Sequence, residues 1–97
     1  MTYHKGDFLI TVPNGTSKKV SGWLNDKEDI GFYKLCRPSG TTIKWVATDT
    51  ASGCRITTAA TRKACMEWCE LNIDLINYQR SKKQYQIYKK FVEDSKG

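Results

Sequence analysis

The 97-residue chain has a single histidine, His4, and lacks the glycine-rich motifs that cradle phosphates. Nucleophilic catalysis needs a nucleophile, a base within hydrogen-bond reach and a group that orients the base, so a histidine-based triad is disfavoured. The acidic side chains of segment 26–29 are interrupted by a lysine, as in an ordinary solvated loop. We therefore expect a non-enzymatic protein without catalytic residues.

The chain also lacks an apolar run of membrane-spanning length. Its N-terminus reaches His4, Lys5 and Asp7 at once and contains no apolar core of a secretory signal. These two features predict a cytoplasmic protein without membrane contact. Hydrophobic residues make up 39% of the chain and charged residues 27%, which is the composition of a globular protein. We expect one domain over residues 1–97.

Positive charge is what the chain has in excess, with a net charge of +6 and a pI of about 9.2. Such a balance favours acidic partners, and nucleic acid is the first candidate. The cations are densest in a C-terminal segment without an acid before Glu93. They are Arg80, Lys82, Lys83, Lys89 and Lys90. This segment is a candidate phosphate-binding surface, and the alternative is that it only solubilises a helix.

Turn signals divide the first sixty residues into short strands. A run rich in strand formers precedes the turn signal at 13–15, so we expect an N-terminal hairpin over 7–24. Arg37-Pro38-Ser39-Gly40 and the polar run 49–53 separate three further alternating segments. These predict a three-stranded antiparallel meander over 30–58.

The pattern changes to helical spacing after the third strand, and we expect a helical region over 60–94. Its first turn can be capped by Thr57, Thr58 or Thr61. Two apolar stripes are separated by the polar run 79–83, so one long helix and two consecutive helices both fit. The predicted fold is therefore α+β, with an antiparallel sheet packed on a long C-terminal helix or on two consecutive helices.

Strand alternation assigns side chains to the two faces of the sheet. We expect these residues to face the helix: Tyr33, Leu35, Ile43, Trp45, Ala47, Cys54 and Ile56. The opposite face would then carry Phe32, Lys34, Lys44, Val46, Arg55 and Thr57. A basic, partly aromatic face suits phosphates and base edges, so Phe32, Lys34, Lys44 and Arg55 are candidate binding residues for DNA or RNA. The alternative is an ordinary solvated face.

The four cysteines are Cys36, Cys54, Cys65 and Cys69. Cys65 and Cys69 are four residues apart on the predicted helix, a spacing that lets two ligands converge on one metal. The meander, however, places Cys36 and Cys54 at opposite ends of the sheet, and no Cys-x-x-Cys motif is present. Buried thiols, a structural zinc site and disulfides are the open alternatives, and a reducing compartment favours thiols. We expect no other cofactor.

Residues 31–70 contain Trp45 in the middle strand, a Ser52-Gly53 turn, and Thr61-Arg62-Lys63 followed by Trp68. This pattern resembles the three-stranded sheet plus helix of the arm-binding domains of tyrosine integrases and of plant ethylene-response DNA-binding domains. The resemblance implies that the sheet face enters the major groove. The residues that it places there are Lys34, Lys44 and Arg55.

A short, lysine-rich single domain with few motifs is also similar in general character to phage-encoded anti-CRISPR proteins. Some members of that group block a type II nuclease by occupying its guide or target-DNA surfaces, and some carry a structural metal. The resemblance implies a phage-type inhibitor that binds a bacterial nucleoprotein in the host cytoplasm, with a CRISPR nuclease as the leading target. The alternatives are a small DNA-binding module that uses its basic sheet face and a zinc-stabilised interaction domain.

Overall fold

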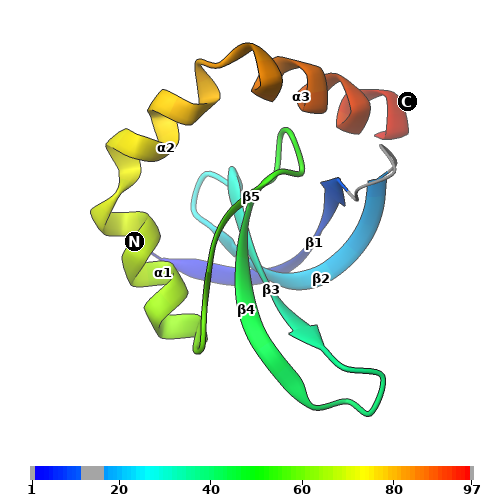
Figure 1. The fold of residues 1–97 in the computed structure, drawn as a ribbon, viewed down its shortest axis with the longest axis vertical. Coiled ribbons are helices and arrows are strands. Elements are labelled where there is room, and N and C mark those ends of the chain that lie inside the picture. The colour runs from blue at the N-terminus through cyan, green and yellow to red at the C-terminus, as the bar shows by residue number, and fades with distance from the viewer. Residues whose placement is uncertain (1, 12–16, 97) are drawn as a thin grey trace.

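The chain folds into an antiparallel sheet followed by helices (Figure 1). The structure, a computed structural model, describes residues 2–11 and 17–96. Its strands are β1 (Tyr3–Thr11), β2 (Ser17–Asn25), β3 (Ile30–Cys36), β4 (Thr42–Asp49) and β5 (Arg55–Ala59). They pair in chain order, so the predicted hairpin and the predicted meander belong to one five-stranded sheet. The turn predicted at 13–15 lies outside the described residues.

Hydrogen bonds close the two other turns that the sequence marks. Between β3 and β4, the N–H of Gly40 donates to the carbonyl of Arg37 over 2.8 Å. Between β4 and β5, the N–H of Gly53 donates to the carbonyl of Asp49 over 2.7 Å. Both glycines have positive φ, 90° and 71°, which a residue without Cβ adopts without steric cost. The two turn predictions are confirmed.

Three helices follow the sheet and form an arc along one side of it (Figure 1). They are α1 (Arg62–Leu71), α2 (Ile73–Arg80) and α3 (Lys83–Lys96). Thr61 caps α1, because its hydroxyl oxygen accepts a hydrogen bond from the N–H of Ala64 over 3.1 Å. Where α1 ends, the side-chain amide of Asn72 donates to the carbonyl of Trp68 over 2.8 Å. The α+β class is confirmed, and the helical region has three helices where the sequence left one or two open.

The main core lies between the sheet and the helices. Its buried members are Ile30, Phe32 and Ala47 from the sheet and Cys65, Cys69 and Ile76 from the helices. The ring of Tyr3 meets that of Phe32 edge to face, with centroids 5.5 Å apart. In residues 2–11 and 17–96, no helix combines the length and the hydrophobicity that spanning a bilayer requires.

The opposite face of the sheet is apolar as well. Phe8 contacts Tyr33 across this face, with ring centroids 6.1 Å apart. The ring of Phe8 also occupies the space beside Gly31, where an added Cβ would lie 2.6 Å from it. Leu24 and Val46 are buried on the same side of the sheet. The sheet therefore has packed side chains on both faces.

The apolar side chains on this opposite face of the sheet form a second cluster, which explains an error in the predicted strand faces. Phe32 lies opposite Ala47, and Lys34 lies opposite Trp45. Directly opposite residues project to one face, so Phe32 and Lys34 point toward the helices. Because β3 carries apolar side chains in both phases, alternation could not select the correct one. The residues assigned to the wrong face are Phe32, Tyr33, Lys34, Leu35 and Thr57.

Arg80, at the end of α2, connects three separate segments. Its Nη1 lies 3.3 Å from Oδ2 of Asp29, and its Nη2 lies 3.4 Å from Oδ1 of Asp49. Nη2 also donates to the carbonyl of Asp29 over 3.2 Å. Only 6% of the Asp49 side chain and 20% of the Arg80 side chain are exposed, so this pair is largely shielded from water. The contacts hold α2 against the end of β4 and the loop that precedes β3.

A substitution at Gly22 tests how closely β2 approaches β3. A Cβ at this position would lie 2.0 Å from the carbonyl oxygen of Phe32, a backbone atom that cannot rotate away. We predict that Gly22→Ala lowers the free energy of unfolding by about 2 kcal/mol in chemical denaturation. Gly6→Ala is the matched control, because its Cβ would meet only the flexible side chain of Leu24. Equal losses in the two variants would contradict the close approach.

Candidate nucleic-acid interface

Two tryptophan rings and three cations alternate beside the start of α1. The guanidinium of Arg62 contacts both rings, with Cζ 4.3 Å from the centroid of Trp23 and 5.8 Å from that of Trp45. Lys5 Nζ lies 5.6 Å from the Trp23 centroid, and Lys34 Nζ lies 5.8 Å from the Trp45 centroid. All four distances fall within the range of cation–π attraction, about 6 Å. We call Lys5, Trp23, Arg62, Trp45 and Lys34 the cation–aromatic ladder.

Strand register brings the ladder together. Lys5 lies opposite Trp23, and Lys34 lies opposite Trp45, so the members of each pair project from the same face. Arg62 is the first residue of α1 and reaches both rings from the helix. The ladder therefore joins β1, β2, β3 and β4 to the start of α1.

The positive charge of the ladder is not balanced by neighbouring acids. Within the part of the chain that the structure describes, Lys5, Lys34 and Arg62 have no carboxylate at ion-pair distance. Arg62 and Lys63 also stand in the first turn of α1, which contains no acid, although the helix dipole disfavours cations there. Residues that lower stability where they stand, such as cations at the start of a helix, are expected at functional sites. The ladder thus presents a positive surface.

The ends of β3 and β4 extend away from the helices as a two-stranded arm, which we define as residues 34–43 (Figure 1). Every residue of the arm is exposed. Segment 30–48 contains the cations Lys34, Arg37 and Lys44 and no acid. Lys34 belongs to both the arm and the ladder, so the positive surface continues onto the arm. A two-stranded ribbon has the width that the major groove of B-DNA admits.

The four predicted sheet-face residues do not share one surface. Phe32 has no exposed surface and lies in the core, so it cannot contact a partner. Lys34 stands in the ladder on the helix face. Lys44 and Arg55 project from the opposite face, because Arg55 pairs with Thr48 and alternation puts Thr48 and Lys44 on one side of β4. The prediction of a common basic face is therefore wrong, because Lys34 in β3 points to the helix face and not to the face of Lys44 and Arg55.

Of the predicted C-terminal basic segment, only Arg80 is withdrawn from the surface. Arg80 is turned inward by its ion pairs with acids of the sheet and loop. The ammonium of Lys82 lies 5.3 Å from the ring centroid of Tyr78. Lys83 and Lys90 are exposed, and Lys89 is half-buried.

The structure distributes the four cysteines over different environments. Cys65 and Cys69 are buried in the core, Cys54 is half-buried after the β4–β5 turn, and Cys36 is exposed in the arm. All four thiols are free. Among residues 2–11 and 17–96, no group of three or more His, Cys, Asp or Glu side chains could hold a metal ion. Burial raises the pKa of Cys65 to about 11 and of Cys69 to about 12, which favours the thiol over the thiolate that binds zinc.

Four ladder residues, Lys5, Trp23, Trp45 and Arg62, were not among the predicted binding residues. The sequence did contain one signal for them, the pair Arg62-Lys63 at the start of a helix, where acids are preferred. Lys5 and Trp23 join Arg62 only through the pairing of β1 with β2 and the packing of α1.

Comparisons of the chain with protein-family models, with curated proteins and with solved structures give no match. A function is therefore inferred from the geometry and charge of the described residues.

The buried thiols predict how stability depends on pH. Burial raises the pKa of Cys65 from 9.0 to about 11 and that of Cys69 from 9.0 to about 12, so the folded state holds these protons more tightly than the unfolded state. Their contribution is complete below pH 9 and is lost as the pH rises toward 12. We predict that the denaturation midpoint falls over this alkaline range.

The double variant Cys65→Ala/Cys69→Ala separates the thiols from the other groups that titrate in the same range. Tyr85 is one such group, because burial and its contact with Asp49 raise its pKa to about 12. The double variant should therefore keep only part of the alkaline decline, measured as the change of the denaturation midpoint with pH. An unchanged decline would show that the thiols do not contribute.

Proposed function

We propose that the protein is a non-enzymatic DNA-binding module that lays its arm in the major groove and sets the ladder on the adjacent phosphates. The observation that carries the proposal is the ladder itself, in which three cations are held on two tryptophan rings without a carboxylate partner among the described residues. Cations that are already held in place lose less conformational freedom when they bind. Each phosphate that they neutralise adds affinity through counterion release.

The arm favours duplex DNA over duplex RNA. The major groove of B-DNA admits a two-stranded ribbon, whereas that of A-form RNA is too narrow for side chains to read. The arm carries Arg37, which suits a guanine edge, and the hydroxyls of Ser39, Thr41 and Thr42. These side chains would read bases while the ladder positions the protein on the backbone.

Removing the charge of the ladder should weaken binding and its dependence on salt. We predict that the triple variant Lys5→Ala/Lys34→Ala/Arg62→Ala reduces the slope of log affinity against log salt by roughly 2 to 3, because each phosphate contact contributes about 0.9. Fluorescence anisotropy with a labelled random duplex, measured at several salt concentrations, provides both affinity and slope. An equal duplex of RNA should bind more weakly.

The control carries the same loss of charge elsewhere. Lys18, Lys27 and Lys90 are exposed and lie outside the ladder and the arm. The variant Lys18→Ala/Lys27→Ala/Lys90→Ala should retain most of the affinity and slope, because only general attraction is reduced. If the two triple variants bind equally, or if the native protein does not bind duplex DNA at low salt, the proposal is wrong.

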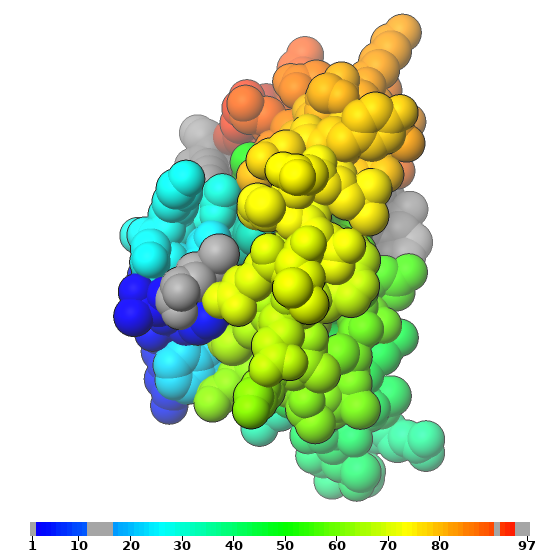
Figure 2. Space-filling view, turned by 90° about the vertical axis from the view of Figure 1, so that its left-hand side faces the viewer, coloured from blue at the N-terminus to red at the C-terminus, as the bar shows by residue number. Residues whose placement is uncertain are grey.

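Exposed apolar residues on the helices favour a protein partner as a second candidate function. Leu71, with 84% of its surface exposed, Leu75 and Tyr78 follow one another at helical spacing, and we call them the helix stripe. α1 and α2 run along the face of the molecule shown in Figure 2. Stripes of this kind are typical of helices that dock in grooves of other proteins. In this second proposal, the protein is a phage-type inhibitor of a bacterial nucleoprotein, with a type II CRISPR nuclease as its leading target.

The second proposal has a separate test. The native protein should inhibit target cleavage by a type II CRISPR nuclease in vitro, and Leu71→Asp/Tyr78→Asp should weaken that inhibition by about tenfold or more, because a charge would enter an apolar contact. The same variant should bind duplex DNA like the native protein. Cleavage at an undiminished rate with excess native protein would remove this candidate.

A further inference from the structure

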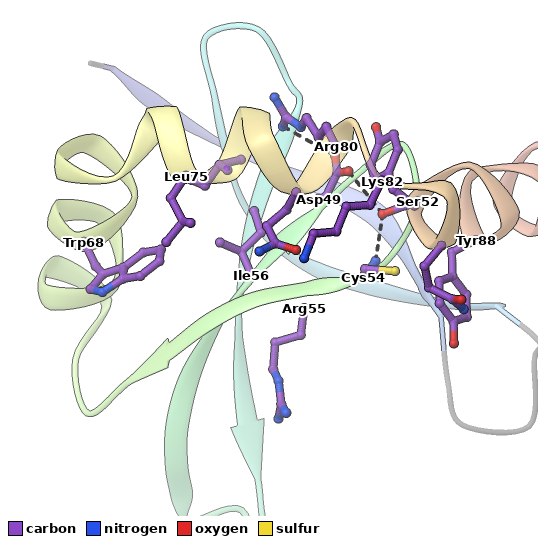
Figure 3. A pocket seen from close by; sticks show the side chains of 14 residues that line it. Asp49, Ser52, Cys54, Arg55, Ile56, Trp68, Leu75, Arg80, Lys82 and Tyr88 are labelled. Carbon is purple, nitrogen blue, oxygen red and sulfur yellow. Dashed lines mark hydrogen bonds and ion pairs between the residues drawn. The ribbon is translucent and has the colours of Figure 1, made fainter.

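A groove of about 330 Å³ lies between β5 and the helices α2 and α3, at the low end of the size range of small-molecule sites. Figure 3 shows Trp68 at one end of it and Tyr88 at the other. The end near Trp68 is apolar, since Leu75 and Ile56 line it beside the indole (Figure 3). None of the residues that line the groove belongs to the ladder or the arm.

In the polar floor of the groove, Asp49 and Ser52 are already hydrogen-bonded. The hydroxyl of Ser52 donates to Oδ2 of Asp49 over 3.1 Å and accepts from the N–H of Cys54 over 3.1 Å. Asp49 is in turn paired with Arg80, and Tyr85 lies beside it. These groups hold one another in position, so the floor is a rigid surface, in which Nε of Arg80 is a buried donor without a hydrogen-bond partner among the described residues.

The groups available to a ligand lie on the helix side of the groove. Gln79 and Gln84 line it, both are exposed, and neither side-chain amide has a hydrogen-bond partner among the described residues. Lys82 also lines the groove and has no carboxylate at ion-pair distance within the described part of the chain. Arg55 contributes less, because it extends from β5 away from the helices (Figure 3).

We infer that this groove binds a nucleoside monophosphate, either free or as an unpaired nucleotide of a strand. The base lies against Trp68 at the apolar end, since every base offers a flat face for stacking on an aromatic ring. The amides of Gln79 and Gln84 match the mixed donors and acceptors of a base edge. Lys82 supplies the charge for the phosphate. The inference does not rest on the proposed arm and ladder interface, which uses other residues.

One NMR experiment tests both surfaces and keeps their outcomes apart. The chain has three tryptophans, so the indole N–H region of a ¹⁵N-labelled sample contains three side-chain signals, one from the groove and two from the ladder. The Trp68→Phe variant assigns the groove signal. Titration with AMP at millimolar concentration should shift the Trp68 signal and leave those of Trp23 and Trp45 in place. If the proposed function is correct, duplex DNA should shift the signals of Trp23 and Trp45 and leave that of Trp68 in place.

Adenosine and inorganic phosphate measure the two halves of the ligand separately. Adenosine should shift the Trp68 signal with weaker affinity than AMP, and phosphate alone should not shift it. A short single-stranded oligonucleotide should shift the Trp68 signal at lower concentration than AMP if the natural ligand is part of a strand, and at similar concentration if it is free. A Trp68 signal that does not move with AMP, or that moves equally with phosphate alone, would overturn the inference.

Exposed rim residues provide variants that leave the core intact. Lys82→Ala should weaken AMP binding by about tenfold, because it removes a charge-assisted contact to phosphate. Its neighbour Lys83 is exposed and does not line the groove, so Lys83→Ala is the matched control and should bind like the native protein. Gln79→Ala should weaken the binding of AMP and adenosine alike. Equal affinity of the two lysine variants for AMP would contradict the assigned role of Lys82.

Discussion

The two layers of the protein are joined by the ion pairs of Arg80. Asp49 ends a central strand with only 6% of its side chain exposed, and Asp29 stands in the loop before the next strand inward. Removing one partner of a buried ion pair leaves the other charge without compensation, at a cost of about 3 kcal/mol or more. The position of α2, and with it the groove beneath α2 and α3, depends on this contact. Ser52 stabilises the same carboxylate by a hydrogen bond.

The packing of the sheet on both faces determines where function can reside. Thr11 at the end of β1 donates to the carbonyl of Gly53 in the β4–β5 turn over 2.9 Å, so the two edges of the sheet approach each other at this end. The second apolar cluster lies on the face away from the main core. A flat, water-facing sheet surface is therefore not formed. What extends beyond the packed layers is the arm (Figure 1). The unbalanced cations lie near the base of the arm and the start of α1.

Features that depend on a few neighbouring residues were predicted well. Proline and glycine at 37–40 and the polar run 49–53 specify turns through backbone conformation, and Thr61 caps a helix through its own hydroxyl. The break at Asn72 was not predicted, because the apolar spacing continues across it. The phase of β3 was predicted wrongly, because the cluster around Phe8 makes both sides of that strand apolar.

Amino-acid order alone was sufficient for the antiparallel strands, the helical C-terminal part and the excess of positive charge, since each follows from local preference or from composition. The surfaces that could bind a partner needed the folded chain. Lys5, Lys34 and Arg62 become neighbours only when strand pairing and helix packing bring distant segments together. The groove likewise exists only where α2 and α3 pass over β5. Contacts between distant residues have no signature in short stretches of sequence, which is the physical reason for this division.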